Sequence, residues 1–228
     1  CPPSRSAAGP AHPGRAARVA AAVAAAAAPA AAADPRVLAP ARYYEVITAS
    51  TGTLAGLVDG ADLTSPVPTC PDWTLRQLAT HVGRAQRWAA QIVSTRSEQA
   101  IAFREVPGGR IPDDPAEHAG WLRAGAERLV TALGEAGDAP VWAFGEQQPA
   151  GVWARRMAHE TTVHAVDAQL TVPSGNGPSG NGPSGNGPSG VPRPAIAADV
   201  AADGIDEWLT MLAGPADGPA DLGAAGLA

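Results

Sequence analysis

The chain has 228 residues, enough for one domain with appendages, and it carries 16 basic and 22 acidic side chains for a formal net charge of −6. This acidic balance gives no electrostatic reason to expect a nucleic-acid partner, which requires clustered positive charge. Two cysteines are too few for a disulfide framework or a cysteine-type zinc site, and no apolar run is long enough to cross a bilayer, so we expect a cytoplasmic protein without a membrane partner.

The N-terminal segment, residues 1–36, is biased to alanine, proline, glycine and arginine and lacks large apolar side chains. We therefore predict a disordered tail. Part of it, residues 15–35, imitates a secretory signal through its arginines, its apolar stretch and its Ala-x-Ala sites. That stretch is nearly all alanine and starts far from the N-terminus, which favours a tail over a signal.

Helical periodicity then recurs along the chain. It is clearest over residues 73–93, where apolar residues alternate at intervals of three and four and Asp72 is the candidate N-cap. The other predicted helices cover residues 40–60, 115–137, 151–170 and 195–212. Residues 138–150 are predicted to be an irregular or briefly extended connection. Five helical patterns without a clear strand predict an all-α bundle with long connections.

Two further segments are low in complexity. Residues 173–190 repeat Pro-Ser-Gly-Asn-Gly, which cannot build a core, so we predict a flexible linker inside a domain of residues 37–212. Residues 213–228 return to glycine, proline and alanine and are predicted to be a disordered C-terminal tail.

The stretch MAHETTVHAVD contains the most informative polar residues. His159 and His164 are five residues apart, about 140° around a helix, so they cannot share one ion. Glu160 and His164 are four apart and lie on the stripe expected to face the bundle interior, where polar groups are costly unless paired or coordinated. The spacing is compatible both with a metal site and with a surface pair beside Arg155 or Arg156.

A third candidate ligand lies on another predicted helix. His81 would complete a set of two histidines and one carboxylate, which leaves positions on an ion for water or substrate. A lone histidine in that place is more often a hydrogen-bonded boundary residue. Asp167 is placed either to orient the imidazole of His164 or to be a solvated carboxylate. Cys70 precedes a helix N-terminus, where a thiol can be reactive, but a buried structural thiol is favoured.

The other histidines are predicted to lie apart from this set. His12 falls in the N-terminal tail and His118 begins a helix, so both are expected to be solvated. His159 points away from the Glu160 face and is expected to cap or pair locally.

Three blocks of sequence resemble the mycothiol-dependent maleylpyruvate isomerase family. They are VPTCPDWTLRQLATHVGRAQRWA (67–89), WARRMAHETTVHAVDAQ (153–169) and AADGIDEWL (201–209), in that order. The resemblance is to the family's N-terminal metal-binding domain, a DinB-like four-helix bundle, and covers about residues 38–212.

The resemblance implies a ligand set and a chemistry. It implies that His81, Glu160 and His164 bind a divalent metal, usually zinc, with water in the remaining positions. Relatives use the metal to bind and activate a low-molecular-weight thiol, mycothiol, because a metal that binds sulfur lowers the thiol pKa. The isomerase adds this thiol to maleylpyruvate, allows bond rotation, and eliminates it to give fumarylpyruvate.

We therefore expect two partners, a small-molecule thiol and a small electrophilic or organic-acid substrate. Arg84, Arg155 and Arg156 could hold an anionic group, or each could be a solvated helix residue. Full-length relatives continue into a C-terminal domain that contributes a catalytic arginine, and we expect a chain ending at Ala228 to lack it. Two alternatives thus stay open, a non-catalytic metal-binding or regulatory bundle and a structural bundle whose three polar residues are merely paired.

Overall fold

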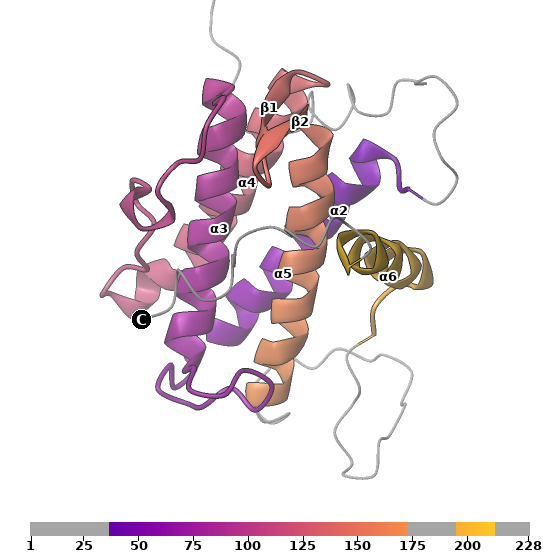
Figure 1. Cartoon of the computed structure of the whole chain (residues 1–228). Helices are drawn as coiled ribbons and strands as arrows, with labels where there is room; N and C mark the ends of the chain where they lie inside the picture. Colours follow the sequence, from indigo (N-terminus) through magenta and orange to yellow (C-terminus); the bar gives the residue numbers. More distant parts are fainter. Residues whose placement is uncertain (1–36, 173–194, 213–228) are drawn as a thin grey trace, which may run out of the picture.

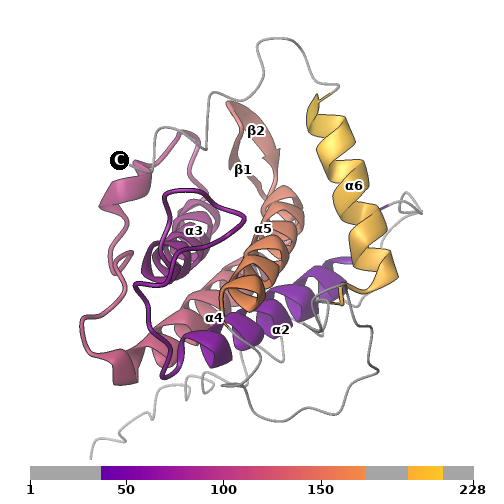
Figure 2. The same ribbon diagram turned by 90° about the horizontal axis from the view of Figure 1, so that it is seen from below.

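Four helices form a bundle, and a fifth helix, α6, lies along its outer side against α5 and α2 (Figures 1 and 2). The computed structural model describes residues 37–172 and 195–212, so the predicted tails 1–36 and 213–228 and the predicted linker 173–190 lie outside the described residues. The helices are α2 (Pro40–Val58), α3 (Leu75–Thr95), α4 (His118–Ala136), α5 (Gly151–Thr171) and α6 (Ala198–Leu212). All five coincide with the helices predicted from sequence, and the predicted helical fold class is confirmed.

The start of α3 differs from the prediction. Thr74, and not Asp72, is the N-cap: its hydroxyl accepts a hydrogen bond from the Gln77 N–H, and the Gln77 side chain accepts one from the Thr74 N–H. This reciprocal pair is a capping box, which satisfies donors that the first helical turn leaves unpaired. Asp72 has a φ of 72°, whereas Thr74 has the extended backbone that an N-cap requires. The predicted cap was therefore wrong by two residues.

A short antiparallel hairpin connects α4 to α5. Its strands are β1 (Pro140–Ala143) and β2 (Glu146–Pro149), within the segment for which a brief extended connection was predicted. Phe144 and Gly145 form the turn with φ values of 52° and 98°, the two positive values that a tight hairpin of this hand requires. Two 3₁₀ turns, Phe103–Glu105 and Pro115–Glu117, complete the connection from α3 to α4.

The helices α3 and α4 approach closely where Gly83 meets Trp121. The Trp121 indole occupies the place that a Cβ of residue 83 would take, so only glycine fits there without displacement. The Arg87 guanidinium lies 4.2 Å from the centroid of the same indole and donates to the carbonyl oxygens of Gly83 and Trp121. This contact fixes the spacing of the two helices just beyond His81.

Charged residues attach α6 to the bundle. Its acidic side chains contact Arg42 and Tyr43 of α2 and Arg155, Arg156 and His159 of α5; they are Asp199, Asp203, Asp206 and Glu207. The apolar residues of the opposite face are 57–63% exposed; they are Ile205, Trp208 and Leu209. Apart from Val200, which is buried in the hydrophobic core, the polarity of α6 is thus the reverse of an ordinary surface helix. Among the helices that the structure describes, none has the length and apolarity needed to cross a membrane.

Candidate metal centre

Side chains from α3 and α5 meet in one cluster. The Nε2 atom of His81 lies 2.8 Å from Oε1 of Glu160, and the Nε2 atom of His164 lies 3.2 Å from the same oxygen. One ligand atom from each of the three residues lies within 4.8 Å of the others. The structure therefore brings together the three residues that the sequence analysis selected from two distant segments.

The electrostatics of the cluster favour a positive charge at its centre. Burial works to raise the pKa of Glu160, but hydrogen bonds from His164 and His81 outweigh it and hold that pKa well below its usual range. Burial works to lower the pKa of His164, but Asp167 and Glu160 raise it to about 9. A proton and a divalent cation compete for the same imidazole lone pair, so a metal bound here would displace the proton from Nε2 of His164.

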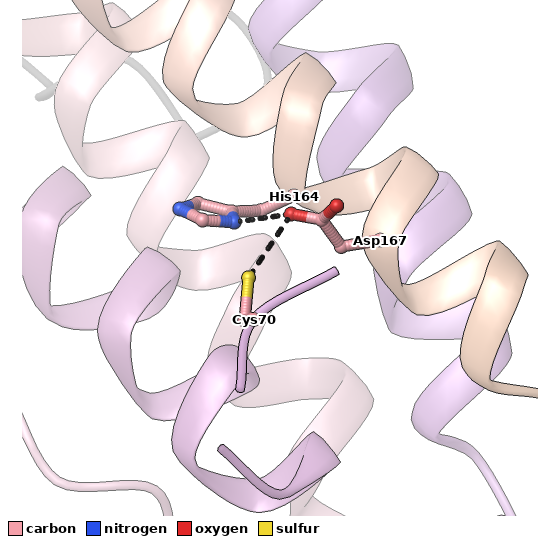
Figure 3. A group of neighbouring side chains, drawn as sticks. All are labelled: Cys70, His164 and Asp167. Carbon is pink, nitrogen blue, oxygen red and sulfur yellow. Dashed lines mark hydrogen bonds and ion pairs between the residues drawn. The ribbon is translucent and has the colours of Figure 1, made fainter. Parts of the chain in front are cut away.

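Asp167 contacts the Nδ1 side of the His164 ring (Figure 3), whereas Glu160 contacts its Nε2 atom. Its Oδ2 accepts a hydrogen bond from Nδ1 of His164 at 2.8 Å, which directs Nε2 toward Glu160. Its Oδ1 accepts from the Thr69 hydroxyl at 2.6 Å. Burial works to raise the pKa of Asp167, but the hydrogen bonds from His164 and Thr69 lower it. Asp167 is only 6% exposed, so the alternative of a solvated carboxylate was wrong.

Cys70 also contacts Asp167. Its thiol donates to Oδ2 of Asp167 at 3.6 Å, and burial together with Asp167 raises its pKa. A raised pKa disfavours the thiolate, which supports the structural role over the reactive one. Cys70, His164 and Asp167 form a second group of possible metal donors, but in that group the Nδ1 atom of His164 already donates to Asp167.

Two aromatic residues flank the histidines and were not selected from sequence. The Trp73 ring lies 5.1 Å from that of His81 and 5.9 Å from that of His164, measured between centroids. The Phe103 ring lies 6.1 Å from that of His81. Nδ1 of His81 is buried and has no hydrogen-bond partner among the described residues. Both imidazoles contact Glu160 through Nε2, but the Nδ1 side of His81 is held by ring packing alone, whereas that of His164 is held by a second carboxylate.

His118 and His159 lie away from the cluster, as predicted, although their surroundings differ from the prediction. His159 is buried and contacts Asp203 of α6 at 2.6 Å, so its partner is distant in sequence rather than local. His118 is 2% exposed and its Nε2 donates to the carbonyl oxygen of Pro112 at 3.0 Å. The prediction that His118 is solvated was wrong, because the loop before α4 folds back over it. His12 lies outside the described residues.

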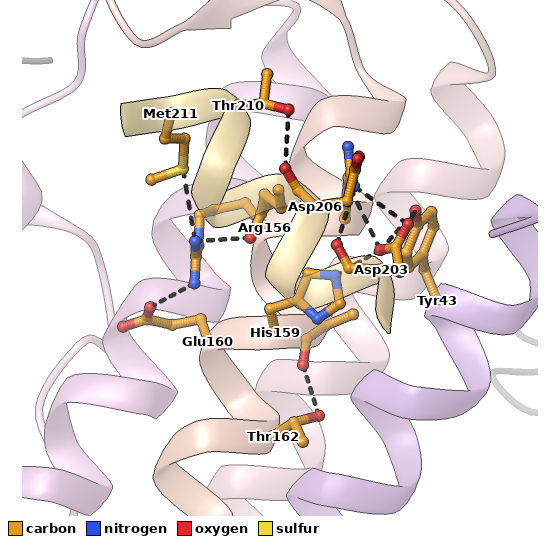
Figure 4. A network of polar contacts seen from close by, with 12 residues as sticks. Tyr43, Arg156, His159, Glu160, Thr162, Asp203, Asp206, Thr210 and Met211 are labelled. Carbon is orange, nitrogen blue, oxygen red and sulfur yellow. Dashed lines mark hydrogen bonds and ion pairs between the residues drawn. The ribbon is translucent and has the colours of Figure 1, made fainter. Parts of the chain in front are cut away.

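The three candidate arginines have partners within the protein. Arg155 contacts acidic residues of α6, and Arg156 lies between α6 and Glu160 (Figure 4). Arg84 donates to the carbonyl oxygen of Gly109 at 3.0 Å and lies over the Phe103 ring. Arg155 and Arg156 are therefore not solvated helix residues. The surface-pair alternative predicts a contact of Glu160 with His164 and one with an arginine, and both contacts are present, although the side chains of His164, Arg156 and Glu160 are only 14–25% exposed.

A comparison with protein families adds an independent observation. Residues 44–169 match the model of the mycothiol maleylpyruvate isomerase N-terminal domain. The chain belongs to this family. The matched range contains the candidate ligands His81, Glu160 and His164 together with Asp167, and it ends before α6. No curated protein and no solved structure matched the chain. Membership of the mycothiol maleylpyruvate isomerase family confirms the resemblance seen in the sequence blocks around the cluster.

Proposed function

We propose that the chain is a divalent-metal-binding protein in which His81, Glu160 and His164 are the ligands and the metal is zinc. The observation that supports this most strongly is the meeting of two imidazole nitrogens with one carboxylate oxygen between α3 and α5. Two histidines and a carboxylate suit zinc and leave positions for water or a substrate, as catalytic metal sites do.

The proposed activity is a thiol-dependent isomerisation or S-transfer with mycothiol as the cosubstrate. A metal bound here would lower the pKa of a coordinated thiol, so that the thiolate is available at neutral pH. The second substrate is a small electrophile or organic acid, the class that a thiolate attacks. Family membership supports the thiol, and the donor set supports its activation.

The chain's own residues have distinct parts in this proposal. Asp167 orients His164, and Trp73 and Phe103 pack beside the imidazoles and limit the access of water to them. Glu160 carries the negative charge, and its lowered pKa keeps it ionised. These residues hold an open site in place without a flexible loop supplying a ligand.

The competing function is a bundle that binds metal without catalysis, or one whose polar residues are only paired. The contacts that favour simple pairing are those of Glu160, because each of its two oxygens already has a partner. Metal binding and thiol chemistry can therefore be tested separately.

The first experiment measures zinc by mass spectrometry in the purified chain after zinc is supplied and excess is removed. We expect one ion per chain in the wild type and in His118→Ala, which removes a buried histidine away from the cluster. We expect loss of the ion in His81→Ala and His164→Ala. A wild-type chain that retains no zinc would refute the proposed function.

The second experiment follows the isomerisation of a cis-enedicarbonyl acid by absorbance, with mycothiol and zinc supplied together and separately. Activity that requires both supports the thiol-dependent enzyme. Zinc binding without any thiol-dependent turnover or conjugation would leave the non-catalytic bundle as the function.

A further inference from the structure

The two carboxylate oxygens of Glu160 have different partners. Oε1 is the atom that faces both histidines, at 2.8 Å from His81 and 3.2 Å from His164. Oε2 lies 3.2 Å from Nη2 of Arg156, one helical turn earlier on α5. The carboxylate is thus held with one oxygen toward the cluster and the other turned to a guanidinium.

Arg156 is itself fixed by α6 (Figure 4). Its Nη1 donates to Oε2 of Glu207 at 2.8 Å, and its side chain is only 15% exposed. A planar guanidinium with separate donors can hold two carboxylates in fixed directions, which a lysine ammonium cannot do as well. Arg156 is therefore a bridge between α6 and the candidate ligand Glu160.

Glu207 offsets the positive charge of Arg156, so that Arg156 can lie beside a metal ion. An unpaired arginine near a divalent metal would oppose metal binding, but Glu207 lies against Arg156 and offsets its charge. Arg155 also joins α5 to α6, through Asp203 and Asp206, yet the structure shows no contact between Arg155 and Glu160. Of these two neighbouring arginines, both of which attach α6, only Arg156 contacts a candidate ligand.

We propose that Arg156 is a positioning residue for Glu160, which it restricts to coordination through Oε1 alone, and that Glu207 holds Arg156 in place and offsets its charge. This inference rests on the proposed metal site. A carboxylate that can offer only one oxygen leaves one more position on the ion open, and that position is available to the thiol or its partner substrate. Arg156 thereby determines how many positions on the ion are open to the thiol and its partner substrate, although it does not contact these molecules itself.

The test replaces the bridge in the full chain and measures Co²⁺ as a spectroscopic substitute for zinc. In Arg156→Gln, we expect the d–d absorption to weaken toward that of a higher coordination number as Glu160 becomes bidentate. Because this change removes a positive charge from beside the ion, metal affinity should not fall. Arg155→Gln is the matched control, because it removes α6 contacts but none with Glu160. It should keep the wild-type spectrum and affinity.

Glu207→Gln provides a second variant in case Arg156→Gln does not fold, which circular dichroism will show. It keeps an oxygen that can accept from Arg156, so the spectrum should stay as in the wild type. The charge of Arg156, which Glu207 no longer offsets, should weaken metal binding several-fold.

Several outcomes would overturn the inference. They are a wild-type spectrum in Arg156→Gln, the same spectral change in Arg155→Gln, and unchanged affinity in Glu207→Gln. If the wild-type chain itself binds neither Co²⁺ nor zinc, the proposed function and this inference both fail. Failure of the inference alone leaves wild-type binding intact.

Discussion

Replacement of Asp167 by asparagine tests the ligand set through a residue that is not itself proposed as a ligand. Asp167 is buried and accepts from Nδ1 of His164 at 2.8 Å, and its charge helps to raise the pKa of His164 to about 9. Asparagine has the same shape and can still accept this hydrogen bond, but it lacks the charge. Removal of such a partner weakens metal binding by roughly 10- to 100-fold, or about 1.4 to 2.8 kcal/mol.

The assay is a zinc titration in competition with a chelator of known affinity, at constant pH and ionic strength. Asp62→Asn is the control, because it makes the same change of charge at an exposed residue of the α2–α3 connection. Thr69→Val is a second comparison, since it removes a 2.6 Å hydrogen bond to Asp167 but keeps the carboxylate charge, and it should have a smaller effect. Wild-type affinity in Asp167→Asn, or an equal loss in Asp62→Asn, would refute the assigned role.

Three further predictions concern stability. Without added metal, the free energy of unfolding should be highest below pH 6.5 and should fall by about 3 kcal/mol at most as the pH rises to 9. The reason is that the folded chain keeps a proton on His164 that the unfolded chain releases. Urea titrations at stepped pH should show this decrease, and a flat profile would contradict it. Gly83→Ala should lower the free energy of unfolding by about 1–3 kcal/mol, because the new Cβ meets the indole of Trp121. Gly120→Ala on α4 is the control: its Cβ meets nothing within 4 Å, so it should not be destabilising in the same titration. Thr74→Ala should lower the free energy of unfolding by about 1 kcal/mol through loss of the N-cap. Asp72→Gly, which removes the other side chain while glycine adopts a φ of 72° freely, should not, and equal losses would argue against the capping box.

Much of the fold was predictable because its helices carry a local signal. Apolar residues at intervals of three and four predict α3 wherever this helix packs, since the period belongs to the helix itself. The stripe from Trp153 to Asp167 has the same spacing and predicts α5, although most of its residues are polar. The hairpin was harder to predict, because its turn combines Phe144 with Gly145 rather than the usual Asn-Gly or Asp-Gly. The N-cap was misplaced because Asp72 and Thr74 are both good capping residues, and only the backbone path distinguishes them.

The candidate site was predictable to a similar degree. The spacing of Glu160 and His164 follows from one helix, and His81 follows from a second helix that must face it. The contact of Arg156 with Glu207 and those of Asp167 with Thr69 and Cys70 were harder to predict, because they join segments far apart in sequence. No periodicity shows which distant carboxylate a given arginine will meet.

The reversed polarity of α6 affects which part of the protein unfolds first. With Trp208 and Leu209 facing solvent, α6 gains little from apolar burial, and salt screens its exposed ion pair, Arg42 with Asp199, more than it weakens the apolar contacts of the bundle. The amides of α6 should therefore exchange with solvent through a partial opening that rising ionic strength promotes, before the bundle unfolds. Each such opening would release Arg156 from Glu207, so ionic strength would act on the region around Glu160 from a helix that contributes none of the three candidate ligands.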